Sequence, residues 1–310
     1  MQKSSVFIRQ NVFPVLTALI WGTAFVAQSV STDHVGPLTF NALRMAIAFV
    51  VLAVVSFIFS RAERKKGGAV PAKKRGSRRE LVLGGICCGI LLAAASNLQQ
   101  LGLSDTSAGK AGFITALYVV LVPVFGIFLH KKASLPVWIG VILSVAGLYL
   151  LCIKDGFSIE RSDFYIFLCA IIFALHILCS DHFVQKVDGV QLSCIQFLVA
   201  AAVSAVGMAF FESPSLSGIA QCIWPVLYVG VFSSGVAYTL QILALEGTDT
   251  TVVTILLSLE SVFSVLAGAV ILGDRLSPRE YVGCVLMFAA VLLAQIPIPL
   301  KKKNKKAESF

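Results

Sequence analysis

Charged residues are scarce in this sequence. They make up 13% of its 310 residues, and 57% of the residues are apolar, whereas soluble globular domains carry about 25% charged residues. Such a chain has too little polar surface to keep its leucines, valines and alanines in water, which excludes a set of soluble domains. The same apolar excess excludes a disordered chain. An integral membrane protein remains, consistent with a mean hydropathy of +0.89.

The sequence also lacks the motifs of enzymes, pumps and metal proteins. It has no G-x-x-x-x-G-K-[ST] loop for ATP, and its eight cysteines form no zinc-like pair of pairs. His176 and His182 stand six residues apart, about 120° around a helix, whereas helical zinc pairs use a spacing of four. No nucleophile with a neighbouring base stands out. We therefore expect no enzymatic activity, no metal, no cofactor and no disulfide.

Ten apolar segments follow one another along the chain. Each is long enough for a membrane-spanning helix, which needs about 20 residues, and most are rich in Gly, Ala and Ser, as packed membrane helices are. The predicted spans are 12–30, 35–60, 81–103, 109–130, 135–153, 163–183, 190–212, 217–245, 250–272 and 279–298. The sequence thus predicts an all-α integral membrane protein with ten transmembrane helices.

The basic residues predict how this bundle is oriented. Nine Lys and Arg lie between Arg61 and Arg79, and five Lys lie between Lys301 and Lys306. With the N-terminus inside, 19 basic residues fall on the cytoplasmic side and five on the other, as the positive-inside rule requires. We expect a multi-pass protein of the plasma membrane with both termini cytoplasmic. Because the basic blocks flank apolar runs, they indicate contact with anionic lipid and not with nucleic acid.

Two internal similarities indicate that a five-helix unit is written twice. Residues 101–108 (LGLSDTSA) align with 243–250 (LALEGTDT) at a spacing of 142, and 38–44 (LTFNALR) align with 190–196 (VQLSCIQ) at a spacing of 152. Five is odd, so the second unit enters the membrane from the opposite side, an inverted repeat typical of secondary transporters. We expect one repeat over 1–153 with a basic cytoplasmic loop at 61–80, a second over 154–298, and a basic cytoplasmic tail over 299–310.

Three motifs resemble a known family. They are 19–26 (LIWGTAFV) followed by 37–44 (PLTFNALR), then 112–123 (GFITALYVVLVP), then 257–263 (LSLESVF) followed by 272–277 (LGDRLS). Together they resemble EamA-type members of the drug/metabolite transporter superfamily, over about residues 12 to 297. The resemblance implies ten helices, a central cavity and carriage of small metabolites, often outward. Ser261 stands where the family often has a proline, so this sequence does not itself predict the proline kink.

Polar residues inside the predicted spans are the candidates for a substrate site, because they are costly in a membrane and usually face the bundle interior. Glu260 is the one carboxylate in the middle of a span, on a stripe with Thr254, Ser261 and Ser264. In a poorly solvated site its charged form is disfavoured, which makes it the candidate for proton coupling; a buried structural carboxylate is the alternative. The candidate cavity residues are Trp21, Arg44, Asn97, Gln100, Tyr118, His176, Tyr238, Gln241 and Glu260.

Alternatives remain open for several of these residues. Arg44 either pairs with Glu260, binds a substrate carboxylate or snorkels to the interface. The polar faces that hold Asn97 and Gln241 either bind substrate or join helices.

The sequence therefore predicts a secondary transporter that moves a small metabolite, an amino acid or related compound, by alternating access, with export as the expected direction. A channel or sensor is the alternative, and a membrane-embedded enzyme is a more distant one. The expected partners are a small-molecule substrate and the lipid bilayer, with the protein a monomer or a homodimer.

Overall fold

The computed structural model describes residues 7–65, 76–105, 108–130, 134–152, 160–267, 270 and 277–294. Helices dominate these ranges, which contain no strand. In the first half the elements are η1 (Ile8–Val12), α2 (Phe13–Ser31), α3 (Pro37–Lys65), α4 (Arg78–Leu103), α5 (Ala108–Ala116), α6 (Tyr118–Phe128) and α7 (Leu135–Cys152). In the second they are α8 (Arg161–Val184), α9 (Gly189–Phe211), α10 (Leu216–Gln221), α11 (Ile223–Tyr228), η2 (Val229–Ala237), α12 (Tyr238–Leu245), α13 (Thr250–Leu257), α14 (Glu260–Ala267) and α15 (Pro278–Ala294).

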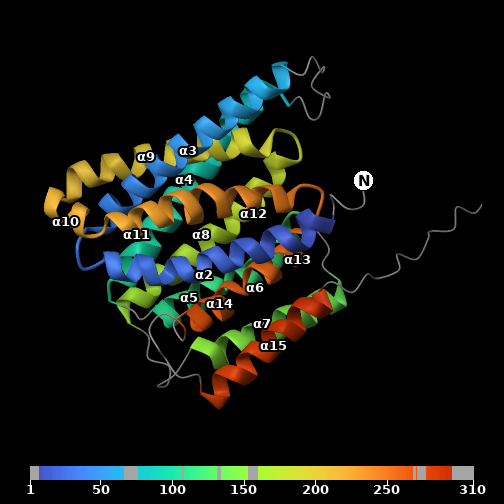
Figure 1. Ribbon diagram of the computed structural model, residues 1–310. Coiled ribbons are helices and arrows are strands. Elements are labelled where there is room, and N and C mark those ends of the chain that lie inside the picture. Colours follow the sequence, from blue (N-terminus) through green and yellow to red (C-terminus); the bar gives the residue numbers. More distant parts are fainter. Residues whose placement is uncertain are drawn as a thin grey trace, which may run out of the picture.

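Eight helical stretches of the described chain are long and apolar enough to cross a membrane, and α7 adds a shorter apolar helix over Leu135–Leu150. The α15 helix has 17 residues, and it packs along α7 at one edge of the bundle (Figure 1). The predicted helical architecture is confirmed in this form. The ten-span inverted repeat stays a prediction.

Three predicted spans are interrupted in the structure. The segment predicted as one helix over 217–245 starts with a short α10, turns at Cys222, and then runs through α11, η2 and α12. The segment over 109–130 is broken at Leu117, between α5 and α6, and the segment over 250–272 at Ser258 and Leu259, between α13 and α14. The last break occurs although Ser261 replaces the proline that the resemblance led us to look for.

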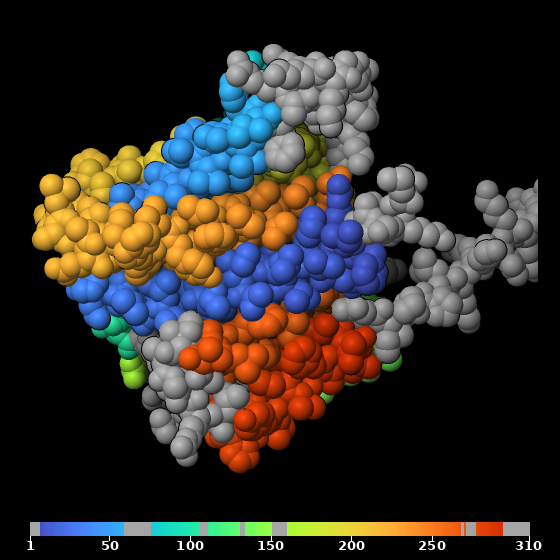
Figure 2. Space-filling model, viewed as in Figure 1, coloured from blue at the N-terminus to red at the C-terminus, as the bar shows by residue number. Residues whose placement is uncertain are grey.

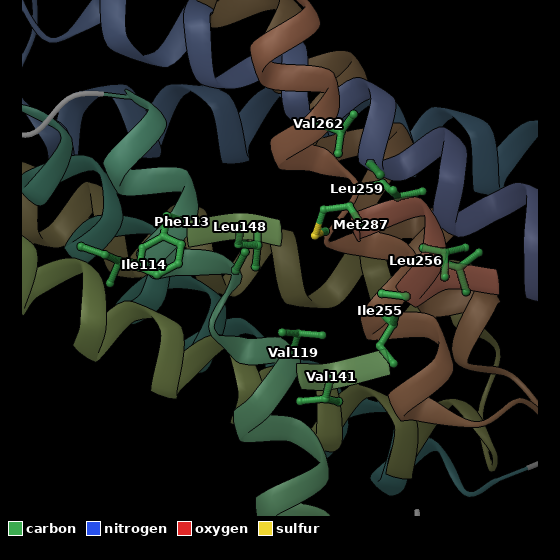
Figure 3. Close-up of a cluster of buried hydrophobic side chains, with 14 of the residues drawn as sticks. Phe113, Ile114, Val119, Val141, Leu148, Ile255, Leu256, Leu259, Val262 and Met287 are labelled. Carbon is green, nitrogen blue, oxygen red and sulfur yellow. The ribbon is translucent and has the colours of Figure 1, made fainter. Parts of the chain in front are cut away.

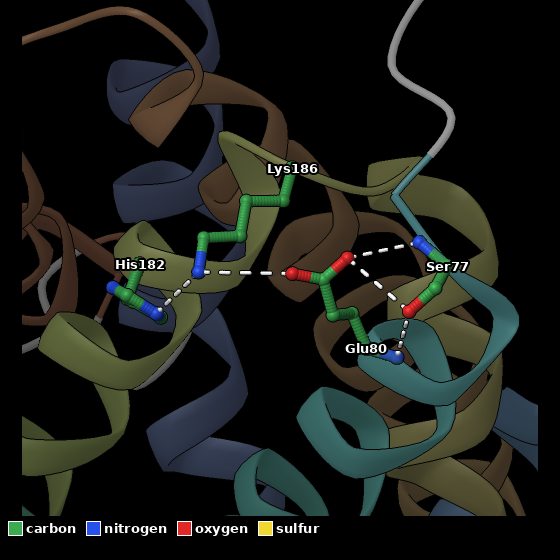
Figure 4. Close-up of polar contacts among 4 residues, drawn as sticks. All are labelled: Ser77, Glu80, His182 and Lys186. Atoms are coloured by element: carbon green, nitrogen blue, oxygen red, sulfur yellow. Dashed lines mark hydrogen bonds and ion pairs between the residues drawn. The ribbon is translucent and has the colours of Figure 1, made fainter.

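Side chains at the helix ends fix where the helices begin. At α4, Ser77 and Glu80 form a capping box, in which each side chain accepts a hydrogen bond from the other's backbone N–H. The Glu80 carboxylate also lies 3.9 Å from Lys186 Nζ, which contacts His182 (Figure 4). At α3, the Glu212 carboxylate accepts hydrogen bonds from the backbone N–H groups of Leu38 and Thr39. The end of α9 thus holds the start of α3.

Apolar side chains pack the bundle in three main groups. One joins α5, α6 and α7 to α13, α14 and α15 through residues such as Phe113, Val141, Ile255 and Met287 (Figure 3). A second joins α6, α8, α9, α12 and α13, and a third joins α3, α4, α8, α9 and α12. The helices α2, α3 and α15 contribute much of the face seen in Figure 2, and exposed apolar side chains on α3 and α15, such as Phe57 and Leu292, suit contact with lipid tails.

Candidate functional site

A cavity lies in the middle of the bundle, between the second and third of these apolar groups, where Tyr118 and Ile177 of the second and Phe173 and Tyr238 of the third line it. Its empty space, including the part that is open to solvent, is about 440 Å³. Helices from both halves of the chain line it. The lining residues are Trp21, Phe25, Gln28, Arg44, Gln99, Thr115, Tyr118, Phe173, Ile177, Ser233, Tyr238, Gln241 and Glu260.

Tyr118 and Glu260 meet in this cavity, each at a helix interruption. Tyr118 is the first residue of α6 and Glu260 the first of α14. The Tyr118 hydroxyl donates a hydrogen bond of 3.2 Å to Glu260 Oε1, and both side chains are buried. The start of a helix favours a nearby carboxylate. The two broken helices thus bring a hydroxyl and a carboxyl group together in the bundle centre.

Aromatic rings form another wall of the cavity. The rings of Trp21 and Tyr238 lie 4.6 Å apart, tilted by 56°. Trp21 Nε1 donates a hydrogen bond to the backbone oxygen of Ser233, in the π-helical segment η2. A π-helical turn leaves backbone groups free for such contacts and often marks a functional site. Thus η2 both holds the Trp21 ring and places Ser233 at the cavity.

Arg44 is the positively charged residue among those that line the cavity. It is 2% exposed, so it does not reach the aqueous surface. Arg44 Nε donates to Asn41 Oδ1 at 2.6 Å, and Arg44 Nη1 donates to Gln28 Oε1 at 3.2 Å. In the part of the chain that the structure describes, no carboxylate lies within 4.0 Å of Arg44, Glu260 included. Of the three predicted possibilities for Arg44, snorkelling and an ion pair with Glu260 are absent from this conformation.

Three other predicted residues lie outside the cavity lining. Asn97 bonds to Asn41 and Ser204 and so joins α3, α4 and α9. Gln100 donates to the backbone oxygen of Gln28. His176 is buried against Gln196, with 3.0 Å between His176 Nε2 and Gln196 Oε1. These three side chains join helices next to the cavity and do not line it.

Several lining residues were not among the predicted ones: Phe25, Gln28, Gln99, Thr115, Phe173, Ile177 and Ser233. For Gln99 the sequence held a signal, because it pairs with Gln241 at the repeat spacing of 142. For the apolar residues there was none, since an aromatic or aliphatic side chain in a membrane span is usually ordinary packing. Within the described ranges, no group of three or more His, Cys, Asp and Glu side chains is placed to hold a metal ion.

A second hollow opens at one end of the bundle, next to the turn between α12 and α13. Its empty space, counted out to its open side, is about 920 Å³. Val122, Leu178, Asp181, Gln185 and Thr251 are among the residues that line it. Tyr118 and Ile177 of the central cavity are close in sequence to Val122 and Leu178, so the two hollows follow one another along α6 and α8.

Comparisons with known proteins agree with this architecture. Residues 10–153 and 161–295 each match the EamA-like transporter family. The chain is similar to an uncharacterized transporter of Archaeoglobus fulgidus, at 28% identity over 91% of this chain and 84% of that protein. It is also similar to the uncharacterized transporter YoaV of Bacillus subtilis, at 21% identity over 90% of this chain and 94% of that protein. A solved crystal structure shares the fold with a TM-score of 0.74 and 21% identity, covering 92% of this chain and 96% of the other. With both halves of its sequence matched, this multi-pass membrane protein belongs to the EamA-like transporter family.

Proposed function

We propose that this protein is a secondary transporter that carries a small metabolite, an amino acid or related compound, out across the plasma membrane by alternating access. The observation that carries the proposal is the central cavity, which is buried, has both polar and aromatic walls, and draws on both halves of the chain. Secondary transporters bind their substrates at the interface of two such halves.

The cavity is lined in part by residues at equivalent positions of the two proposed repeats. Two pairs are separated by 142 residues and two by 152, the spacings of the internal sequence similarities. The pairs are Gln99 with Gln241, Tyr118 with Glu260, Trp21 with Phe173, and Phe25 with Ile177. Tyr118 and Glu260 also share the same local structure, because each begins a helix after an interruption. This correspondence supports a substrate site on the symmetry axis of an inverted repeat.

Helix packing supports the same symmetry. Under the proposed repeat, the packing of α4 on α8 corresponds to the packing of η2 and α12 on α2. Both sets of helices are in contact. Likewise, α5 and α6 pack on α8, as α13 and α14 pack on α2. Two related halves that exchange these contacts would provide inward-open and outward-open shapes of similar energy, which alternating access requires.

The position of the second hollow supports loading from the cytoplasm. It lies at the end of the bundle that the basic residues place inside, and it leads toward Tyr118 and Ile177 of the cavity. An exporter needs a path of this kind in its inward-facing state. The proposed orientation has both termini cytoplasmic.

The test uses purified protein in two steps. A thermal-shift screen against a metabolite panel identifies a ligand, because a ligand that binds only the folded state stabilises it by mass action. Proteoliposomes loaded with unlabelled ligand are then assayed for uptake of labelled ligand. Saturable counterflow is expected; flux without saturation or counterflow would indicate a channel and contradict the proposal.

Glu260 is the proposed coupling residue, and Tyr118 its partner. We expect Glu260→Gln to bind ligand and to keep counterflow, but to lose transport driven by a pH gradient. Tyr118→Phe removes the hydrogen bond and keeps the carboxyl group, so it is expected to retain pH-driven transport at a reduced rate. A well-folded Glu260→Gln protein with full pH-driven transport would exclude the coupling role.

A further inference from the structure

We propose that Arg44 is an anion-binding subsite of the central cavity, and that the cargo carries a carboxylate group that Arg44 Nη2 binds. This inference rests on the proposed transport function and specifies what the cavity recognises. It starts from a buried donor: Arg44 lines the cavity, and its Nη2 has no hydrogen-bond partner among the residues that the structure describes.

The guanidinium is held in a fixed orientation. Asn41 and Gln28 accept hydrogen bonds from Nε and Nη1, and the group lies over the Phe40 ring at 5.7 Å from its centroid. Both amides are themselves fixed. Asn41 Nδ2 donates to the Ser96 backbone oxygen and to Asn97 Oδ1, while Gln28 Nε2 donates to the Ala24 backbone oxygen at 3.4 Å. A rigid donor loses little freedom when an anion binds, which favours affinity.

Within the described ranges, no carboxylate forms an ion pair with the Arg44 guanidinium. An arginine side chain stays protonated in proteins, and a buried charge is costly unless it is paired. The two groups that hold Arg44 are neutral amides, which orient the guanidinium and leave its charge in place. The carboxyl group of Glu260 lines the same cavity, but its described partner is the Tyr118 hydroxyl.

A carboxylate suits the unpartnered Nη2 donor of Arg44 better than a neutral group does. Arg44 Nη2 carries two N–H groups, and a carboxylate oxygen accepts a charge-assisted hydrogen bond that is about twice as strong as a neutral one. The rings of Trp21, Phe25, Phe173 and Tyr238 line other parts of the cavity, beside polar side chains such as Gln99 and Gln241. The expected cargo therefore has a carboxylate at one end and an apolar or aromatic body that contacts these rings.

The test compares carboxylic acids with their amides, which have nearly the same shape and lack the negative charge of the carboxylate. We would use butyrate and butyramide, 3-phenylpropionate and 3-phenylpropionamide, and phenylalanine and phenylalaninamide. Binding to the purified full-length protein is measured by calorimetry, and again by fluorescence in a Trp138→Phe/Trp224→Phe protein whose remaining tryptophan is Trp21 in the cavity wall. At least one acid is expected to bind about 10- to 100-fold more tightly than its amide and to change the Trp21 emission.

Two arginine variants complete the test. Arg44→Gln is expected to remove the preference for the acid over its amide. Arg161→Gln is the matched control, because Arg161 also makes a hydrogen bond and a ring contact, both to Tyr165, but lies outside the cavity. It is expected to bind like the unmodified protein.

The proposal is overturned if no acid of the panel binds more tightly than its amide, a result that needs no variant and would leave a water molecule as the partner of Nη2. It is also overturned if Arg44→Gln keeps the preference. Counterflow of a neutral ligand without any acid preference would refute the anion site and keep the transporter. Acid binding without counterflow would keep the anion site and refute the transporter.

Discussion

Gly22 is the residue at which a single added methyl group tests the packing around the cavity most directly. It lies on α2, one residue after Trp21, where α2 packs against α14. A Cβ at this position would lie 2.6 Å from the Glu260 backbone oxygen, 2.7 Å from Phe263 Cβ and 2.7 Å from Ser264 N. Two of these atoms belong to the backbone, so they cannot rotate away as the end of a side chain would.

The size of the effect follows from two opposed contributions. Ordinary contact begins at 3.4 Å, so the Gly22→Ala protein must separate α2 from α14 by about 0.8 Å. Overpacking of this kind costs about 1–3 kcal/mol, whereas replacing a helical glycine by alanine gains about 1 kcal/mol. Gly112, in α5, is the matched control, since a Cβ there meets no atom within 4 Å and only the gain applies. The two variants should differ in free energy of unfolding by about 1–3 kcal/mol.

Thermal unfolding of the purified variants in detergent measures this difference. For a chain of this length we expect Gly22→Ala to melt about 2–6 °C below Gly112→Ala. Because the displaced backbone belongs to Glu260, Gly22→Ala should also weaken the bond to Tyr118 and slow counterflow. If Gly22→Ala melts at or above the Gly112→Ala temperature, α2 and α14 do not pack as closely as described.

Three further predictions concern the cap at the start of α3 and the basic loop at 61–80. Glu212→Ala removes the acceptor at the start of α3 and should lower stability by about 1–2 kcal/mol, with Glu212→Gln closer to the unmodified protein; equal melting temperatures would refute the cap. A cysteine introduced at Lys73, outside the described residues, should resist an impermeant thiol reagent applied to intact cells, and labelling there would overturn the proposed orientation. Changing Lys73, Lys74 and Arg75 together to glutamine should leave ligand affinity unchanged in calorimetry, since this loop is predicted to orient the protein and not to bind the cargo; a large loss of affinity would contradict that role.

Much of the fold followed from the sequence, because long apolar runs in a chain with few charges form membrane-spanning helices. The helices α3, α4, α8 and α9 begin and end within a few residues of the predicted spans. The helix interruptions did not follow. No proline marks the break at Ser258, and nothing in the sequence of residues 229–237 (VGVFSSGVA) predicts a π-helical segment. Such breaks are stabilised by contacts with other helices, as between Trp21 and Ser233, which a single-chain pattern does not contain.

The site residues also divide into those that the sequence pattern predicted and those whose place depends on tertiary packing. Trp21, Arg44, Tyr118, Tyr238, Gln241 and Glu260 were expected at the cavity and line it, because side chains with polar groups inside a span usually face the bundle interior. Between Gln99 and Gln100 the sequence pattern favoured Gln100, and the structure places Gln99 in the lining. The two differ by about 100° around α4, so the outcome depends on how α4 is rotated against α8 and α9, which only tertiary packing determines.

Arg44 shows most clearly the difference between the partners that a sequence pattern suggests and those that the structure shows. The sequence holds one arginine and one carboxylate in mid-span, and the simplest expectation from charge alone pairs them. In the structure each has found neutral partners instead, Asn41 and Gln28 for Arg44 and Tyr118 for Glu260. Two unpaired groups of opposite sign in one cavity are costly in an empty protein. A cargo with a carboxylate, together with a proton on Glu260, would remove both costs at once, and the binding of one would then favour the binding of the other.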